Sequence, residues 1–289
     1  MPDEITLVED AAPLARRTDN RDDQLVDLWL HGRTANTVTA YRRDVDRMRS
    51  FVDKPISAVT LSDLQAFADT LVGAPSTRKR ILSATRSLLR FIASAGLIPV
   101  NVGAALRVPK GRDTLADRII TKPDARKMLR SGKRPRDTAL LRLLYETGCR
   151  RAELAGLRWR DLAGDEKGAF ITVLGKGDKT RTVRIAGDTL AALNALRGEA
   201  ADDAPVFGGR GGPLSVSQIY RVVRDAGARA GLKRSVSPHF LRHAHASHAL
   251  DAGAPIALVR DTLGHSSVAV TDRYLHARPK ESSGKFLRL

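Results

Sequence analysis

Apolar residues recur at spacings of three and four along much of the chain, and this periodicity most constrains the fold. The clearest run places five apolar side chains on one helix face: Val38, Tyr41, Val45, Met48 and Val52. The pattern breaks once, where Phe170–Leu174 and Thr182–Ile185 flank a turn that contains glycine and predict two short paired strands. The sequence therefore predicts a mainly α-helical protein with one small β-hairpin.

Four helical segments are expected between Asp22 and Gly96. The first is expected to present three apolar residues on one face: Leu25, Leu28 and Trp29. The third begins near Leu61 with Ser62 as its N-cap, and the fourth runs from Pro75 to the stop signal at Gly96. Because strand-type alternation is missing here, we expect an all-α domain of about 80 residues.

The chain is long enough for two domains. Its 289 residues exceed the usual size of one domain, and glycine, proline and basic residues interleave between the two helical parts. We therefore expect four regions in order: residues 1–20 as a flexible arm, residues 21–103 as a helical domain, residues 104–118 as a linker, and residues 119–289 as a larger, mostly helical domain with a C-terminal tail.

Basic residues are concentrated in the second part of the chain. The formal net charge is +17 and the isoelectric point is near 10.7. Residues 1–105 hold 14 Lys and Arg against 13 Asp and Glu, whereas residues 106–289 hold 35 against 19. A solvated basic surface is the simpler explanation, but neutralising nucleic-acid phosphates requires a surplus of this kind, and we favour nucleic acid as the partner.

The sequence lacks the signals of a secreted or membrane protein. No run of about 18 apolar residues occurs, and the acidic N-terminus has no apolar stretch behind a basic flank. Cys149 is the only cysteine, so an intramolecular disulfide is excluded. We expect a cytoplasmic protein without a membrane partner.

Four cationic or imidazole side chains lie in motifs with strong local structure. Arg150 directly follows Thr-Gly-Cys, and Lys176 lies at the turn of the expected hairpin. His239 and Arg242 are three residues apart, so they share one face of the helix that begins after Ser237.

A further motif surrounds Gly264, which has the character of a helix C-cap. This places His265 just beyond a helix end. Ser266 or Ser267 is then expected to cap a short helix that carries Tyr274.

Two arginines, a lysine, two histidines and a tyrosine can cleave a phosphodiester without metal. Guanidinium groups stabilise the charge of a pentavalent transition state, and a lysine can protonate the departing alkoxide. A tyrosine hydroxyl can attack phosphorus, although with a pKa of about 10 it needs help. His245 and His248 could grip a metal ion, but no cysteine or carboxylate completes a site, so we expect neither metal nor cofactor.

These motifs resemble those of the tyrosine recombinase, or phage integrase, family. The resemblance rests on three segments together with Tyr274: Thr147–Leu154, His239–His243 and Leu263–Ser267. The turn at Gly175–Lys179 is similar to the family's hairpin, Thr34–Arg43 to the start of its N-terminal domain, and Asn101–Lys110 to its linker. The layout resembles compact Xer-type and integron-type members. It implies the tyrosine-recombinase fold, with a SAM-like core-binding domain before the catalytic domain.

The resemblance also implies a role for each catalytic position. Arg150 and Arg242 would clamp the scissile phosphate, with Glu153 supporting the first arginine. His239 would act as general base or as a phosphate hydrogen-bond donor, and His265 would orient the phosphate. Lys176 would protonate the 5′-hydroxyl leaving group, although Lys179 lies close enough to leave that choice open. Tyr274 would attack and form a 3′-phosphotyrosyl bond.

The implied partner is double-stranded DNA with a specific recombination site. Strands would be exchanged through a Holliday junction by a homo-tetramer, with a monomer in solution, and the sequence leaves open a paralogous recombinase or a directionality factor. Nine basic residues are expected to contact DNA: Arg42, Arg43, Arg78, Lys79, Arg80, Lys110, Arg112, Lys179 and Arg181. The tail Arg278–Leu289 is long enough to dock on a neighbouring protomer.

Two other functions share these features. A type IB topoisomerase-like enzyme would use the same chemistry, although the compact N-terminal helical domain favours recombination. A DNA-binding relative without catalysis is a different class, and the complete set of catalytic positions argues against it. Arg151 and Cys149 stand where many relatives carry apolar residues, but neither replaces a catalytic group.

Overall fold

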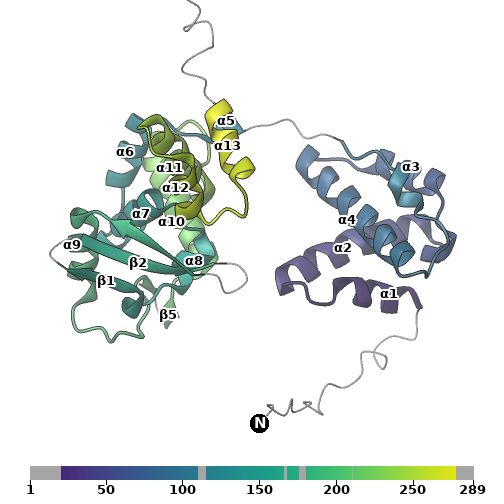
Figure 1. Ribbon diagram of the computed structural model, residues 1–289, viewed down its shortest axis with the longest axis horizontal. Coiled ribbons are helices and arrows are strands. Elements are labelled where there is room, and N and C mark those ends of the chain that lie inside the picture. The colour runs from purple at the N-terminus through teal and green to yellow at the C-terminus, as the bar shows by residue number, and fades with distance from the viewer. Residues whose placement is uncertain (1–20, 110–114, 166–167, 176–179, 210, 278–289) are drawn as a thin grey trace, which may run out of the picture. The chain divides into compact units, whose positions relative to one another are not determined.

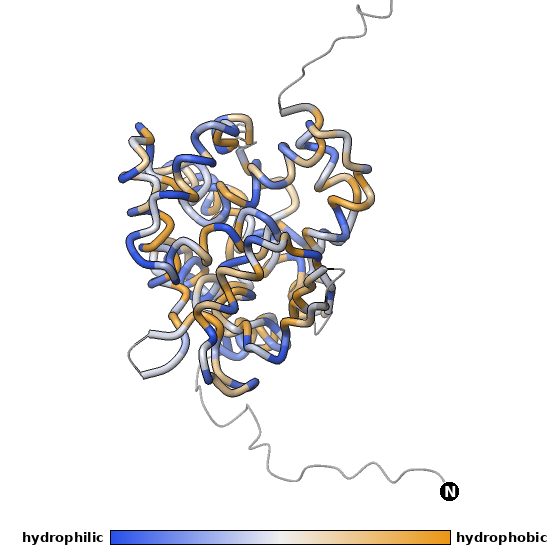
Figure 2. The backbone as a smooth tube through the Cα atoms, turned by 90° about the vertical axis from the view of Figure 1, so that its left-hand side faces the viewer, coloured by the Kyte–Doolittle hydropathy of each residue, from blue (hydrophilic) through white to orange (hydrophobic). Residues whose placement is uncertain are grey.

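The chain folds into two compact units, Met1–Arg112 and Asp113–Leu289 (Figure 1). The computed structural model describes residues 21–109, 115–165, 168–175, 180–209 and 211–277. The boundary between the units falls inside the segment 104–118 that the sequence marks as a linker. Polar and apolar residues alternate along the helices of both units, as expected for helices that each bury one face (Figure 2).

The first unit is built from four helices around one core. The helices are α1 (Arg21–Leu30), α2 (Ala35–Val52), α3 (Leu61–Thr70) and α4 (Pro75–Ser94), with 3-10 turns η2 (Ile56–Ala58) and η3 (Val102–Ala105). The expected apolar run is confirmed, because Val45, Met48 and Val52 are buried and Val38 and Tyr41 pack against the same core. Within the described part of this unit there is no strand, as the sequence predicts.

Two details of the first unit differ from the sequence prediction. Leu28 is 53% exposed, because the buried stripe of α1 follows Leu25, Val26, Trp29 and Leu30 instead. Helix α3 is capped by Thr60, not by Ser62. The Thr60 hydroxyl accepts a hydrogen bond from the Asp63 N–H while the Asp63 carboxylate accepts one from the Thr60 N–H, which forms a capping box.

The second unit is larger and mostly helical. Its helices are α5 (Leu115–Arg118), α6 (Lys122–Arg130), α7 (Pro135–Thr147), α8 (Arg151–Gly156), α9 (Gly187–Arg197), α10 (Val216–Arg229), α11 (Pro238–Asp251), α12 (Ile256–Leu263) and α13 (Val268–Ala277), with the 3-10 turn η4 (Trp159–Asp161). The strands are β1 (Leu162–Asp165), β2 (Gly168–Leu174), β3 (Thr180–Ile185), β4 (Gly208–Gly209) and β5 (Gly212–Pro213).

The expected hairpin is the pair β2 and β3, which run antiparallel with Val173 opposite Arg181. The sequence did not predict β1, which pairs with the other edge of β2. Its four residues, Leu-Ala-Gly-Asp, are too short and too mixed to show alternation. Alternate residues of β2 are buried (Ala169, Ile171 and Val173), so one face of the sheet joins the main core.

Helix α13 closes the second unit against α5, α11 and α12 (Figure 1). Together they enclose a small core of buried residues: Leu115, Ile119, Ala246, Val259, Leu263 and Tyr274. Leu115 comes from the end of the expected linker, and its burial makes that end part of the second unit. Among the described residues there is no helix long and apolar enough to cross a membrane.

Candidate active site

Two helices of the second unit end on left-handed glycines that lie close to the candidate residues. Gly148 ends α7 with φ 61°, and Gly264 ends α12 with φ 63°, which confirms the C-cap expected at Gly264. This conformation favours glycine because it has no Cβ. The last carbonyl groups of each helix are left without partners inside the helix and carry its negative dipole end.

Arg242 joins these two helix ends. It lies on α11 with 5% of its surface exposed, and it donates to the Gly148 carbonyl at 2.5 Å and to the Leu263 carbonyl at 2.7 Å. Burial and the neighbouring Arg150 lower the pKa of Arg242 to about 10, so the side chain remains charged at neutral pH. The fold thus holds a cation at a fixed place between two helix C-termini.

Arg150 and Arg181 share a single carboxylate, Glu153. Arg150 donates to it through its backbone N–H and through Nη1, both at 2.7 Å, and Arg181 donates at 2.8 and 3.1 Å. Burial alone would raise the pKa of Glu153, but the hydrogen bonds from Arg181 and Arg150 lower it below its ordinary value. Glu153 is therefore an anion with a 5% exposed side chain, and it fixes both guanidinium groups.

Arg150 and Arg181 also reach the end of α12. Arg181 donates from Nε to the Thr262 carbonyl at 2.7 Å, and Arg150 approaches the Gly264 carbonyl at 3.4 Å. The Arg150 side chain is 37% exposed, whereas that of Arg181 is 12% exposed. Arg150 can therefore meet a phosphate from solvent, while Arg181, which the sequence assigns to DNA binding, is engaged inside the protein.

His265 follows Gly264 directly and is half-buried. Its Nδ1 lies 2.9 Å from the hydroxyl of Thr271, which is fully buried on α13. Burial and the nearby Arg242 and Arg150 lower the pKa of His265 to about 4, so the ring is neutral at pH 7. Its ring stacks on that of Tyr274 with 6.4 Å between centroids.

Tyr274 lies on α13 with 7% of its surface exposed. Burial raises the pKa of its hydroxyl above the ordinary value, although Arg242 and Arg273 oppose the rise. The hydroxyl lies 2.9 Å from Nδ1 of His243. This contact was not foreseen, because the sequence provided no reason to assign His243 a role of its own.

His239 is exposed one turn before His243 on α11. Partial burial of its ring and the charge of Arg242 lower the pKa of His239. The His239 and His243 rings are 6.3 Å apart, and within the described part of the chain no hydrogen bond joins His239 to Tyr274. Lys176 and Lys179, the two candidates for general acid, lie outside the described residues.

The other imidazoles of α11 serve the packing of the second unit. His245 Nδ1 lies 2.9 Å from the Tyr145 carbonyl, and His248 lies within hydrogen-bonding distance of the Tyr145 hydroxyl and the Ile120 carbonyl. Across the described residues there is no cluster of three or more side chains placed to bind a metal ion.

The basic residues expected on the first unit fall into two groups. Arg42 forms an ion pair with Asp27, and Arg80 forms one with the buried Asp44. Arg43 and Lys79 are exposed, and Nε of Arg78 is buried without a hydrogen-bond partner. Lys110 and Arg112 lie outside the described residues.

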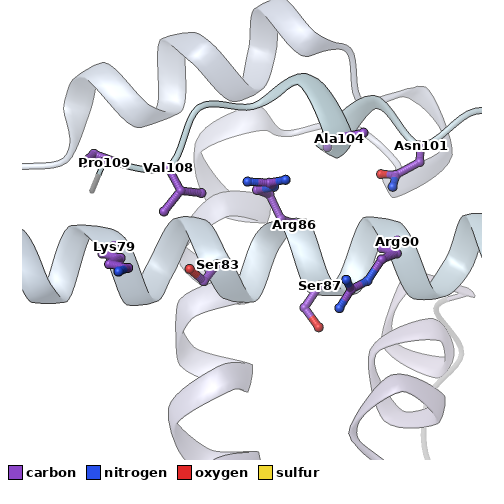
Figure 3. Close-up of a pocket in the computed structure, with 10 residues that line it drawn as sticks. Lys79, Ser83, Arg86, Ser87, Arg90, Asn101, Ala104, Val108 and Pro109 are labelled. Carbon is purple, nitrogen blue, oxygen red and sulfur yellow. The ribbon is translucent and has the colours of Figure 1, made fainter. Parts of the chain in front are cut away.

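A basic pocket, which the sequence did not predict, lies between α4 and the segment 101–109 (Figure 3). Lys79, Arg86 and Arg90 line it from α4, and Asn101 and Ala104 line it from the facing segment. Lys79, Arg86 and Arg90 lie at helical spacings of seven and four, so they share one face of α4. The same spacing in the sequence could have identified this face.

Known proteins match both units of the chain. Residues 118–281 match the phage integrase family, and residues 25–96 match the N-terminal SAM-like domain of phage integrases. The chain is 35% identical to a tyrosine recombinase XerC of Xanthomonas campestris pv. campestris (strain B100) over 260 residues, which are 84% of this chain and 79% of the relative. It is 34% identical to a tyrosine recombinase XerD of Rhizobium meliloti (strain 1021), with 85% and 86% covered.

Solved structures show the same fold. A lambda integrase (75–356) dimer bound to a COC′ core site superposes with a TM-score of 0.74 at 21% identity, covering 90% of this chain and 95% of that one. A XerH recombinase bound to its difH substrate superposes with a TM-score of 0.70 at 20% identity, covering 89% and 81%. The chain therefore belongs to the phage integrase family of tyrosine recombinases.

Proposed function

We propose that this protein is a site-specific recombinase that cleaves and rejoins DNA through a 3′-phosphotyrosyl bond at Tyr274. One observation carries the proposal. Arg150, Arg242, His265 and Tyr274 come from separate parts of the second unit and converge around the end of α12. Guanidinium groups clustered beside a tyrosine hydroxyl are what transesterification at a phosphodiester requires.

Each residue has one role in this reaction. Arg150 and Arg242 bind the non-bridging oxygens of the scissile phosphate, and the ion pair with Glu153 holds Arg150 in place. His265, neutral and fixed by Thr271, donates its remaining N–H to the phosphate. Tyr274 attacks phosphorus, and Lys176, or Lys179 in its place, protonates the 5′ oxygen that leaves. The phosphotyrosyl bond conserves the energy of the broken bond, so the step needs neither ATP nor metal.

The first unit supplies DNA affinity. Residues 21–103 form the core-binding domain, and residues 119–289 the catalytic domain. Lys79, Arg86 and Arg90 of α4 bind backbone phosphates from the pocket in Figure 3, and the exposed Arg43 adds a further contact. By analogy with the related lambda integrase tetramer bound to a Holliday junction, four protomers act together on two DNA sites. The tail Arg278–Leu289 then contacts a neighbouring protomer, and its deletion should weaken assembly.

The test is recovery of covalent protein–DNA adducts. Wild type and Tyr274→Phe are incubated in EDTA with fragmented host DNA and denatured in detergent, and the attached strand ends are sequenced. We expect adducts with wild type alone, joined at one recurrent sequence. Scattered adducts would indicate a topoisomerase-like enzyme. Tight DNA binding without adducts from either protein would indicate a DNA-binding relative without catalysis.

A further inference from the structure

Among the described residues of the second unit, His243 is the one whose side chain lies in hydrogen-bonding contact with the hydroxyl of Tyr274. Its Nδ1 lies 2.9 Å from the Tyr274 hydroxyl, and the two ring centroids are 5.7 Å apart. It directly follows Arg242 on α11, so the helix that holds the phosphate-binding arginine also places this imidazole. The rings of His239 and His265 lie near the pair, but neither has a described hydrogen bond to the tyrosine hydroxyl.

We propose that His243 accepts the phenolic proton of Tyr274 when the tyrosine attacks the scissile phosphate. This inference rests on the proposed function and assigns the proton acceptor within it. It gives His239 the second of its two expected roles, that of a hydrogen-bond donor to the phosphate. His243 contacts the reacting oxygen, so it acts as a catalytic residue.

The step balances in protons and bonds. The Oη–H bond of Tyr274 breaks as an N–H bond forms at Nδ1 of His243, and the freed electron pair of Oη forms the bond to phosphorus. The bond between phosphorus and the 5′ oxygen breaks, and that oxygen takes a proton from the lysine of the hairpin. In rejoining, the 5′-hydroxyl returns its proton to the lysine as it attacks the phosphotyrosine, and the imidazolium returns its proton to Oη.

The surroundings of His243 keep its ring available as an acceptor. It is half-buried, and it faces His239 and Arg242 on its own helix, Arg118 of α5, and Arg273 with Tyr274 on α13. Burial and these neighbouring charges lower the pKa of His243 to about 4, so the imidazole is neutral at pH 7. A bound phosphate adds negative charge that opposes the surrounding cations and favours the imidazolium as it forms.

If the contact has only a structural role, removing it should have the opposite effect on the cleavage rate. If His243 only holds the hydroxyl of a buried tyrosine in the free protein, removing it would release the nucleophile and speed cleavage. A proton acceptor predicts slower cleavage. The effect of one substitution on the cleavage rate therefore decides between the two.

The experiment uses His243→Asn, because the Asn amide oxygen can accept the hydrogen bond at the place of Nδ1 but cannot take the proton. His239→Asn, one turn away on the same helix, is the matched variant. The probe is a duplex that carries the cleavage sequence recovered from the adduct experiment, with sulfur in place of the bridging 5′ oxygen. A thiolate leaves without protonation, so the rate no longer depends on the general acid.

We expect His243→Asn to cleave this duplex about 100-fold more slowly than wild type at pH 7, in the range usual for loss of a general base. The deficit should shrink as pH rises from 7 to 9.5, because hydroxide can then remove the phenolic proton. The His239→Asn deficit should not change with pH, and DNA affinity and the melting temperature should stay close to those of wild type in both variants. Cleavage by His243→Asn at or above the wild-type rate, or a deficit independent of pH, would overturn the inference.

Nitrogen NMR of the imidazole tests the contact without DNA. In the full chain, the Nδ1 resonance of His243 should shift in Tyr274→Phe relative to wild type, because the phenol hydrogen bond is lost. An unchanged resonance would overturn the role proposed for His243 but not the proposed function of the protein. Wild type that forms no adduct with the duplex would overturn the proposed function together with it.

Discussion

The candidate site has two sides that are held in different ways. The arginine side comprises Arg150, Glu153, Arg181 and Arg242, and its guanidinium groups are fixed by backbone carbonyls and a buried carboxylate. The tyrosine side comprises His243, His265, Thr271 and Tyr274, and its polar contacts join one side chain to another. Backbone carbonyls at helix ends cannot move without the helices, whereas side-chain contacts can be exchanged one at a time.

The helix under the tyrosine side is also less covered by protein. Three large apolar residues of α13 are more than a third exposed: Val268, Val270 and Leu275. Leu263, at the end of α12 on the arginine side, is fully buried. In the protein without DNA, the arginine side is therefore held by more fixed contacts than the tyrosine side.

Arg242→Lys should have the largest effect, because it breaks the arginine side at its centre. Lysine keeps the charge, but its single Nζ cannot reproduce the planar fork by which Nη1 and Nη2 donate to the Gly148 and Leu263 carbonyls. We expect single-turnover cleavage to fall about 100- to 1000-fold, as when one donor to a transition-state oxyanion is lost. DNA affinity, measured by fluorescence anisotropy, should change little. A variant that cleaves within a few-fold of wild type would show that the fork geometry of Arg242 is not needed.

Glu153→Gln tests whether the carboxylate organises the arginine side. The change leaves Arg181 buried without its counter-ion, a loss worth about 3 kcal/mol in the free energy of unfolding. We expect part of it to be recovered in Glu153→Gln with Arg181→Met, because the unpaired charge is then gone. Urea unfolding followed at Trp159, in a Trp29→Phe background, reports the second unit alone. Additive losses would show that the two side chains do not act as a pair.

The arginine side shows how far the sequence could predict this site. The motifs located Arg150, Glu153 and Arg242 because short segments with fixed spacing carry them. Arg181 was assigned to DNA as a basic residue beside the hairpin turn, although strand alternation already places it on the same face as the buried Val183 and Ile185. Its partner Glu153 is 28 residues away, and the contact depends on how β3 packs beside α8 and α12.

The tyrosine side was predicted less completely, for a related reason. Tyr274 was identified by its distance from His265, but its contact with His243 joins residues 31 positions apart on two helices. The signal available was weak: His243 lies four residues after His239, on the same face of the helix. Helix positions in the first unit and helix ends such as those at Pro75 and Gly264 were predictable because periodicity and capping are local. Leu28 was missed because tertiary packing decides which stripe of α1 is buried, and β1 because four mixed residues show no alternation.

His265→Asn should change how stability depends on pH. In the folded chain the pKa of His265 is lowered to about 4, below the value of about 6.5 usual in an unfolded chain. The neutral ring therefore contributes stability above pH 6.5 that is lost as pH falls towards 4. As pH falls from 6.5 towards 4, we expect the free energy of unfolding of His265→Asn to fall by about 1 to 2 kcal/mol less than that of wild type, allowing for partial solvent exposure of the ring.

The pH measurement again follows Trp159 during urea unfolding, between pH 7 and 4.5. His31→Asn is the matched control, because His31 is exposed and belongs to the first unit. It should leave the pH dependence at Trp159 unchanged. If His265→Asn has the same profile as this control, the ring is not shielded and the tyrosine side is more open than the structure indicates.

Gly264→Ala should have the smallest effect and tests the point where the two sides meet. At φ 63° an added Cβ strains the backbone by about 1 kcal/mol, and it would also meet the Arg181 side chain at 3.3 Å. Gly231→Ala is the matched control, since Gly231 has φ 74° and open space around the new Cβ. Both variants should lose a similar free energy of unfolding to backbone strain, so any additional loss in Gly264→Ala measures the contact with Arg181.

If that additional loss is accompanied by slower cleavage while Gly231→Ala cleaves normally, the arginine side requires close packing at the end of α12. Equal losses and normal cleavage in both would mean that Arg181 moves aside, and the arginine side would then be no more rigid than the tyrosine side.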